Sequence, residues 1–468
     1  MKNHLSLFKS SKALCAIAAV VSLSFASCKK DFSPADDIAA STATSSARPA
    51  NANAKAHVPN EILVKFKKGI SSQGKSLALG KVNGKAKEKL LTKAMEQEGD
   101  NEGLILVNTP LDVLEAVDHL KGNADIEYVE PNYVYTHESI SADPYFKSGY
   151  MWGIGSTNIY GTKAATAWGL GHTGSKNIVV GIVDEGIQFQ HPDLNGQIWT
   201  NPYDPVDGID NDGNGYKDDI HGWDFANNDN SVYDAGTTGS GDDHGTHVAG
   251  TIGAKANTSG VVGMNWNITI ISTKFLGANG GSTYGAIKAI DYLTDLKKRH
   301  PALNIVASNN SWGGGGYSQA LYDAISRANA KDILFVAAAG NGGSDGVGDN
   351  NDATASYPSN YTLPNVIAVA AITSTGAKAS FSNYGAKSVD IGAPGQSILS
   401  TTAYNLYEYY SGTSMATPHV TGAVALYKST HPTATGAMIK SAIFNSAIPT
   451  SSLTGKCVTG GRLNVAGF

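Results

Sequence analysis

Five short apolar runs, separated by stretches with helical spacing, constrain the fold of residues 142–468 more than any other feature. Each run is continuous and rich in β-branched residues, as expected for a strand that is covered on both faces. The runs are Ile178–Val183, Thr269–Phe275, Ile305–Ser308, Ile333–Ala339 and Val366–Ala371, and helical stretches occur at Tyr284–Arg299, Ser318–Ala330 and Met415–Ser429. The pattern predicts an α/β fold with a mainly parallel sheet. Ligand chemistry in such sheets collects at the carboxyl ends of the strands.

A smaller pattern precedes this body, between residues 57 and 138. Strands are expected at Glu61–Phe66, Gly103–Val107 and Ile126–Tyr135. Helical spacing occurs at Lys85–Glu98 and at Leu111–Lys121, where the apolar stripe consists of Leu111, Leu114, Val117 and Leu120. These elements predict a small α+β domain ahead of the main body.

The first thirty residues have the pattern of an export signal. Lys2, Lys9 and Lys12 precede a charge-free stretch, residues 13–27, which has the length of a secretory h-region and is too short to span a bilayer as a helix. Cys28 follows two small residues and resembles the lipidated cysteine of bacterial lipoproteins, the alternative being a simple signal peptide with an incidental cysteine. We therefore expect a signal peptide at 1–27, export across the inner membrane, and a lipid on Cys28 as the only membrane anchor, at the outer membrane or cell surface.

Composition defines what lies between the signal and the folded parts. Residues 28–56 are rich in Ala, Ser, Thr, Pro and Asn, which predicts a flexible linker before the domains at 57–138 and 139–468. The net charge of -5 offers no basic surplus, so we expect no nucleic-acid partner. If Cys28 carries lipid and Cys15 leaves with the signal, Cys457 has no partner for an intramolecular disulfide.

Two acid–base candidates stand at or near the ends of predicted strands. Asp184 ends the run IVVGIVD, where capping of the next turn is the simpler interpretation. His244 and His247 stand three apart in DDHGTHVAG, at the start of a small-residue helix. Zinc binding is the competing interpretation of this pair, but the segment lacks the Glu and the third ligand of HExxH sites.

Ser414, in GTSMATPHV, is a candidate nucleophile at the entrance of a helix, although Ser is also a common N-cap. With Asn341 in FVAAAGNGG, the four motifs stand in an order that resembles the subtilases, the subtilisin-like serine proteases. The resemblance spans nearly all of residues 142–468. It implies a three-layer subtilisin-like fold and, at 57–138, a ferredoxin-like prodomain that inhibits the enzyme in the precursor.

The resemblance also implies the catalytic roles. Ser414 would attack the peptide bond, His244 would take its proton, and Asp184 would orient the imidazole. The side chain of Asn341 and the N–H of Ser414 would bind the oxyanion. Where the family has Asp-Thr-Gly or Asp-Ser-Gly, this chain has Glu185 in the middle position, and we expect its carboxylate to point away from the imidazole. His247 and His419 are expected to pack near the site.

Substrate residues are implied in the same way. The walls of a cleft for an extended peptide are expected at Ser311, Trp312, Gly313, Leu276, Gly277, Ala338, Ala339 and Gly340. No Asp or Glu stands on these walls, which disfavours a strict requirement for Lys or Arg in the substrate. An apolar or mixed preference is expected.

Structural calcium is the expected cofactor, with no catalytic metal. Residues 204–243 hold eleven Asp against one Lys, and part of this segment resembles the front half of an EF-hand loop. Its expected ligands are Asp210, Asp212, Asn214, Tyr216, Asp218 and Asp219, the alternative being a solvated acidic insertion. The subtilase resemblance implies a second site at Asp193 and Asn257, completed by the carbonyls of Ser259 and Val261.

The function expected from the sequence is that of a secreted, monomeric serine endopeptidase that acts on polypeptides through an acyl-enzyme. Self-cleavage of the prodomain is expected between Tyr135 and Pro144, which would separate the enzyme from a lipid on Cys28 unless the prodomain stays bound. Two alternatives are a catalytically idle binding or adhesion module and a maturation protease for one partner. A catalytically idle module usually lacks a triad residue, and none is missing here. The sequence does not distinguish a maturation protease from a general endopeptidase.

Overall fold

The computed structural model describes residues 29–30, 57–133, 141–155, 157–235 and 241–468. It divides the chain into two compact units: the smaller contains residues 57–133, and the larger contains Lys29–Lys30 together with the described residues from 141 to 468. The expected signal peptide, Cys28, most of the linker and much of the expected cleavage segment lie outside the described residues. Within the described part of the chain, no helix is both long and apolar enough to cross a bilayer.

The smaller unit is a four-stranded antiparallel sheet in the order β3-β4-β2-β5, with α3 packed against β2 and β5. Its core combines Ile62, Val64 and Val107 of the sheet with Ala116 and Leu120 of α3. The elements are β2 (His57–Phe66), α1 (Ser72–Gly80), β3 (Lys85–Leu90), α2 (Lys93–Gln97), β4 (Leu104–Asn108), α3 (Val113–Leu120) and β5 (Ile126–Tyr133). The unit is an α+β domain, as predicted.

Two details of this unit correct the sequence-based predictions. Residues 85–90 form the exposed strand β3, not the first half of a helix, and only Lys93–Gln97 is helical. The Lys- and Glu-rich sequence suits either a helix or a solvated edge strand, and pairing with β4 decides between them. On α3 the predicted apolar stripe is wrong at Leu114, which is 49% exposed, because the buried face runs through Val113 and Ala116.

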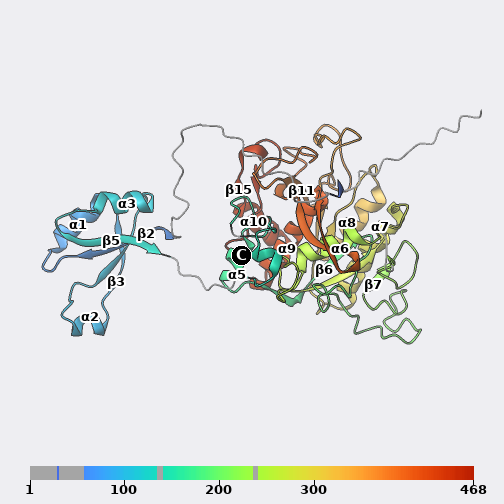
Figure 1. Ribbon diagram of the computed structural model, residues 1–468, viewed down its shortest axis with the longest axis horizontal. Coiled ribbons are helices and arrows are strands. Elements are labelled where there is room, and N and C mark those ends of the chain that lie inside the picture. The colour runs from blue at the N-terminus through green and yellow to red at the C-terminus, as the bar shows by residue number, and fades with distance from the viewer. Residues whose placement is uncertain (1–28, 31–56, 134–140, 156, 236–240) are drawn as a thin grey trace, which may run out of the picture. The chain divides into compact units, whose positions relative to one another are not determined.

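The larger unit is built on a nine-stranded sheet in the order β15-β16-β12-β11-β10-β9-β6-β8-β7 (Figure 1). All neighbours from β16 to β7 are parallel, which confirms the predicted α/β class; β15 pairs with β16 antiparallel. The strands are β6 (Gly174–Asp184), β7 (Gly222–Asp224), β8 (Asn267–Lys274), β9 (Ile305–Asn310), β10 (Leu334–Ala338), β11 (Val366–Ile372), β12 (Ile391–Pro394), β15 (Ile448–Pro449) and β16 (Gly461–Arg462).

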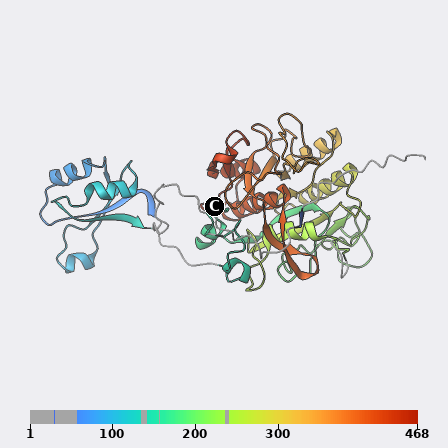
Figure 2. The same ribbon diagram turned by 45° about the horizontal axis from the view of Figure 1, so that its top comes forward.

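Helices cover both faces of this sheet. Because successive strand residues point to opposite sides, each strand contributes side chains to two separate cores. Val180 and Ile182 of β6 join the core under α6 and α9, whereas Val179 and Val183 join the core under α7 and α8. The result is the three-layer arrangement expected from the resemblance (Figure 2). The helices of the unit are α4 (Pro144–Lys147), α5 (Ala164–Gly169), α6 (Asp243–Gly253), α7 (Thr283–Arg299), α8 (Gln319–Asn329), α9 (Thr413–Thr430) and α10 (Gly436–Ser446), with 3-10 turns η1 (Ala403–Asn405) and η2 (Ser451–Leu453).

A second, small sheet leads directly into α9. Strands β13 (Ile398–Thr402) and β14 (Leu406–Ser411) form an antiparallel hairpin, and β1 (Lys29–Lys30) pairs with the other edge of β14. The hairpin packs against α6 through β13. It therefore ties the start of α9 to the helix that follows Asp242.

Candidate active site

Asp184 and His244 are in direct contact at the carboxyl edge of the large sheet. Asp184 is the last residue of β6, and His244 is the second residue of α6. The Nδ1 atom of His244 lies 2.8 Å from Oδ1 of Asp184, which is only 1% exposed. A buried carboxylate on Nδ1 fixes the orientation of the ring and directs Nε2 to any proton exchange.

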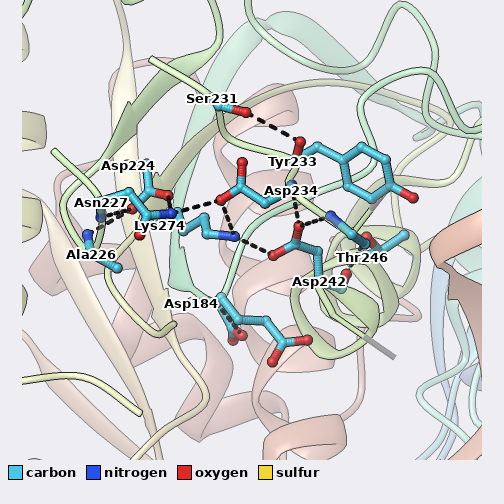
Figure 3. Close-up of polar contacts among 12 residues, drawn as sticks. Asp184, Asp224, Ala226, Asn227, Ser231, Tyr233, Asp234, Asp242, Thr246 and Lys274 are labelled. Atoms are coloured by element: carbon cyan, nitrogen blue, oxygen red, sulfur yellow. Dashed lines mark hydrogen bonds and ion pairs between the residues drawn. The ribbon is translucent and has the colours of Figure 1, made fainter. Parts of the chain in front are cut away.

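A buried lysine stands beside this pair. Lys274 ends β8 and is the register partner of Asp184 on β6 and of Asp224 on β7. Its Nζ lies 2.6 Å from Oδ1 of Asp242 and 3.0 Å from Oδ2 of Asp234 (Figure 3). Burial alone would lower the pKa of Lys274, but the two carboxylates raise it. The ammonium group of Lys274 is therefore held charged. It binds Asp242, which stands two residues before His244 in the sequence.

Glu185, which departs from the family pattern, contacts residue 244 through the backbone. Its Oε1 accepts a hydrogen bond from the N–H of His244 at 2.6 Å, and its own N–H donates to Oδ1 of Asp184 at 2.8 Å. Burial raises the pKa of Glu185 to about 7. The positive charge of a protonated His244 opposes this shift, and the negative charge of Asp184 adds to it. The sequence marks this position as unusual but does not indicate the contact.

Ser414 is the second residue of α9, at the helix entrance as predicted. Its Oγ donates to the carbonyl of Ser311 at 3.1 Å, and the Oγ of Ser311 donates to the carbonyl of Ser414 at 2.9 Å. Pro418 is the sixth residue of α9. Because proline has no N–H, the carbonyl of Ser414 has no helical donor four residues on, and Ser311 supplies one.

The helices that carry His244 and Ser414 pack against each other, and α9 also packs on β6. Asn341 follows β10, and its Oδ1 accepts hydrogen bonds from the N–H and the Oγ1 of Thr413, at 2.8 and 2.9 Å. The amide oxygen is thus engaged, which leaves the Asn341 NH₂ group as a donor beside the start of α9. The N-terminal N–H groups of a helix are themselves free donors.

The expected substrate segments all follow parallel strands of the large sheet, in which β9 and β10 are neighbours and β6 separates β9 from β8. Ser311, Trp312 and Gly313 come after β9, Ala338–Gly340 ends and follows β10, and Leu276–Gly277 comes after β8. Gly313 is exposed and could contact a substrate. Ala339 is fully buried, so it could only support the expected cleft wall from beneath. The ring of Trp312 packs edge-on against Phe275, with 4.9 Å between their centroids.

His247 and His419 are fully buried, in agreement with their predicted packing roles. Nε2 of His247 bonds to the carbonyl of Ile398 at 2.8 Å, and its ring stacks on Tyr410. Burial lowers the pKa of His247 to about 3 and that of His419 to about 4. Both rings are therefore neutral at pH 7 and lack the titration range that a general base requires.

The acidic loop brings several of the expected calcium ligands together. Asp210 and Asp212 both accept from the N–H of Asn214, at 3.1 and 3.0 Å, and the Asn214 amide donates to Asp219 Oδ2 at 2.9 Å. Asp218 turns elsewhere and accepts from the N–H groups of residues 207 and 208. The ring of Tyr216 packs on aromatic residues.

At the second expected calcium site, Asp193 and Asn257 are also in contact. Asp193 accepts from the Asn257 amide at 2.9 Å and from the N–H of Val261 at 2.9 Å, and the N–H of Ser259 donates to Asn257. Nowhere in the described ranges do three or more His, Cys, Asp or Glu side chains form a group that could hold a metal ion. Any calcium would therefore depend on backbone and amide oxygens as well.

Residues 175–467 match the family described as "Subtilase family", which is more than half of the chain. The chain belongs to the subtilase family. Residues 43–132 match a second family, described as "Fervidolysin N-terminal prodomain". The protein is thus a subtilase serine endopeptidase with an N-terminal prodomain.

Two relatives at 34–35% sequence identity agree with this assignment. Subtilisin amylosacchariticus of Bacillus subtilis subsp. amylosacchariticus is 35% identical over 334 residues, which cover 71% of this chain and 73% of the relative. A thermophilic serine proteinase of Bacillus sp. (strain AK1) is 34% identical over 382 residues, 80% of this chain and 79% of the relative. A solved structure of a cold adapted subtilisin-like serine proteinase is 28% identical, with a TM-score of 0.47, over 62% of this chain and 88% of that one.

Proposed function

We propose that this subtilase hydrolyses peptide bonds with Asp184, His244 and Ser414 as its catalytic triad, through an acyl-enzyme intermediate. The observation that carries the proposal is the 2.8 Å contact between His244 Nδ1 and the buried carboxylate of Asp184. A serine hydroxyl is a weak nucleophile at neutral pH and needs such an oriented base. Ser414 stands at the entrance of a helix that packs against the helix of His244.

The reaction follows from these positions. Nε2 of His244 accepts the proton of Ser414 Oγ as that oxygen attacks the peptide carbonyl, and Asp184 stabilises the imidazolium that forms. The oxyanion accepts hydrogen bonds from the Asn341 side chain and the N–H of Ser414. The imidazolium then protonates the departing amine, and a water molecule releases the acyl group by the same steps.

The mechanism is tested by Ser414→Ala in the full chain. We expect an intact precursor that hydrolyses neither unfolded casein nor peptides, because the nucleophile is gone. Ser429→Ala, at the other end of the same helix, is the matched control and should process and cleave normally. A Ser414→Ala protein that matures alone and hydrolyses peptides would remove the triad from the mechanism.

Polypeptide substrates follow from the family, and the breadth of specificity is a separate proposal. We expect a general endopeptidase with an apolar or mixed preference, since glycine-rich segments without carboxylates follow β8 and β9. A panel of peptides tested beside casein distinguishes this from a maturation protease. Cleavage confined to one sequence would favour the latter.

Maturation and location are further parts of the proposal. The prodomain is expected to inhibit the enzyme until self-cleavage between Tyr135 and Pro144, and export with lipidation at Cys28 places the precursor at the outer membrane or cell surface. N-terminal sequencing and intact mass of the cell-associated and released forms test all of these points. Cys28→Ser should abolish labelling by fatty acid, and Cys15→Ser should not; labelling that survives Cys28→Ser contradicts the anchor.

Structural calcium in the loop 210–219 completes the proposal. Burial raises the pKa of Asp219 to about 6 and also raises that of Asp212, and no Lys or Arg in the described residues forms an ion pair with either carboxylate. A bound Ca²⁺ would relieve this crowding, and the oxygen-rich donors suit it. Both carboxylate oxygens of Asp193 accept hydrogen bonds, and so do those of the loop residues Asp210, Asp212 and Asp219.

The calcium proposal is tested on the Ser414→Ala precursor, which cannot digest itself. EDTA should lower its thermal midpoint, and Ca²⁺ but not Mg²⁺ should restore it. Asp212→Asn should reduce this response, whereas Asp323→Asn, on the surface of α8, should leave it unchanged. A thermal midpoint that is indifferent to EDTA would show that the loop is a solvated acidic insertion.

A further inference from the structure

The start of α6 has an unusual cap. The first N–H groups of a helix have no acceptor within the helix, and the residue before the first turn usually supplies one from its side chain. Asp242 occupies that position, but its φ of 61° is left-handed and its side chain makes no capping hydrogen bond. The N–H of His244, in the first turn, therefore needs an acceptor from elsewhere.

The side chain of Asp242 is engaged in the opposite direction. Its Oδ1 binds Nζ of Lys274 at 2.6 Å, and its Oδ2 accepts from the N–H groups of Asp234 and Ala235, at 2.6 and 3.1 Å (Figure 3). The two oxygens thus bind the backbone of residues 234–235 and the end of β8. Asp242 cannot cap α6 without breaking a nearly buried ion pair.

Glu185, which directly follows β6, takes the capping role instead. Its Oε1 accepts from the N–H of His244 at 2.6 Å, and its own N–H donates to the Asp184 oxygen that binds His244 Nδ1. The backbone turn after Glu185 lies directly on the helix, since a Cβ on Gly245 would stand 2.1 Å from the carbonyl oxygen of Gly186. One residue therefore contacts both members of the Asp184–His244 pair.

We infer that Glu185 is a positioning residue for the general base. It holds the backbone of His244 and the carboxylate of Asp184 in register, and its charge favours the imidazolium that forms during acyl transfer. This inference rests on the triad of the proposed function. The residue is not required by the family pattern, in which a small hydroxyl residue stands at this place, and so it is a property of this chain.

Several charged groups share the surroundings of Glu185. Asp184 lies before it on the chain, His244 and Asp242 face it from the start of α6, and Tyr410 faces it from β14. Lys274 neutralises part of the charge of Asp242. Burial is the main cause that raises the pKa of Glu185 to about 7, which lies close to the ordinary pKa of an imidazole.

This coupling has a kinetic signature. The active form carries an ionised Glu185 and a neutral His244, so two protons must be lost to reach it. In a plot of log kcat/KM against pH, the slope for the natural enzyme should therefore approach two at low pH. Glu185→Gln keeps an oxygen acceptor for the N–H of His244 but has no charge. We expect its slope to approach one, with the acid limb displaced to lower pH, because a nearby anion no longer favours the protonated imidazole.

Removal of the acceptor has a different effect. Glu185→Ala leaves the N–H of His244 without its cap, and we expect kcat to fall about tenfold with little change in KM, about 1.4 kcal/mol of transition-state stabilisation. Glu185→Gln should lose less than Glu185→Ala. Gln190→Ala, an exposed change five residues further on, is the matched control and should match the natural enzyme in both parameters. A purely structural role would lower thermal stability and leave the slope of the acid limb unchanged.

The titration of His244 by NMR tests the inference independently of activity. In the Ser414→Ala background, Glu185→Gln should lower the pH midpoint of the His244 ring signals, and Gln190→Ala should not. An unchanged midpoint, or an acid limb that is identical in the natural enzyme and Glu185→Gln, overturns the inference. Absence of any Ser414-dependent hydrolysis would instead overturn the proposed function, while the NMR result would still decide the role of Glu185.

Discussion

Replacement of Lys274 by Met should destabilise the larger unit by several kcal/mol. The side chain of Lys274 is 5% exposed and that of its partner Asp242 is 2% exposed, so the change leaves a buried carboxylate without its cation. Removal of one partner from a buried ion pair typically costs about 3–5 kcal/mol. The contact with Asp234, which is 33% exposed, is screened by solvent and adds little to that figure.

The same reasoning predicts a rescue. Asp242→Asn removes the isolated charge and keeps an oxygen that can accept from the N–H groups of Asp234 and Ala235, so the double variant should recover most of the lost stability. The loss in Lys274→Met alone should also be smaller at pH 5 than at pH 8, because a protonated Asp242 no longer needs the cation. Lys331→Met, an exposed change, is the matched control and should stay within about 0.5 kcal/mol.

The assay is urea-induced unfolding followed by tryptophan fluorescence, on precursors that carry Ser414→Ala and at constant calcium. Self-digestion then does not compete with unfolding. A loss below about 1 kcal/mol for Lys274→Met would show that the pair is effectively solvated. A double variant as unstable as the single one would show that Lys274 acts by packing and not by charge.

Three further predictions follow from single contacts. Asn341→Ala should lower kcat about 10²–10³-fold with little change in KM, as measured by peptide hydrolysis, since one oxyanion donor is lost. Ser311→Ala should cost about 1–3 kcal/mol in urea unfolding, because it leaves the carbonyl of Ser414 without a donor. The folded pKa of His419 is lowered to about 4, so the unfolded chain binds its proton first, near pH 6.5, and stability should fall from there to pH 4. His419→Asn has no imidazole to take up a proton on unfolding. The difference in free energy of unfolding between this variant and the natural protein should therefore become smaller from pH 6.5 to pH 4.

Much of the larger unit could be predicted because the decisive information is local. The five apolar runs lie within strands β6, β8, β9, β10 and β11 or next to them, and the helical stretches contain most of α7, α8 and α9. Parallel strands buried on both faces must be apolar throughout, and that property can be recognised without knowledge of their partners. The subtilase resemblance predicts that Asp184 and His244 meet, and they are in contact.

Predictions failed where a segment has two acceptable local structures. Residues 85–90 alternate Lys with other residues and suit a helix as well as an edge strand, so only the pairing with β4 makes them β3. On α3, helical spacing allowed two adjacent stripes, and contact with the sheet selected the one through Val113 instead of Leu114.

The sequence by itself determined the α/β class of the main body and the presence of a preceding α+β unit, because periodicity is a property of neighbouring residues. It also identified the acid–base and nucleophile candidates, because each stands in a short motif and the motifs follow the order seen in subtilases. Only the tertiary structure decided which side chain caps α6, since Asp242 and Glu185 are both chemically suited to that N–H. The choice depends on Lys274, ninety residues from Asp184 in sequence and its neighbour across two parallel strands, which engages Asp242 and leaves the N–H of His244 to Glu185.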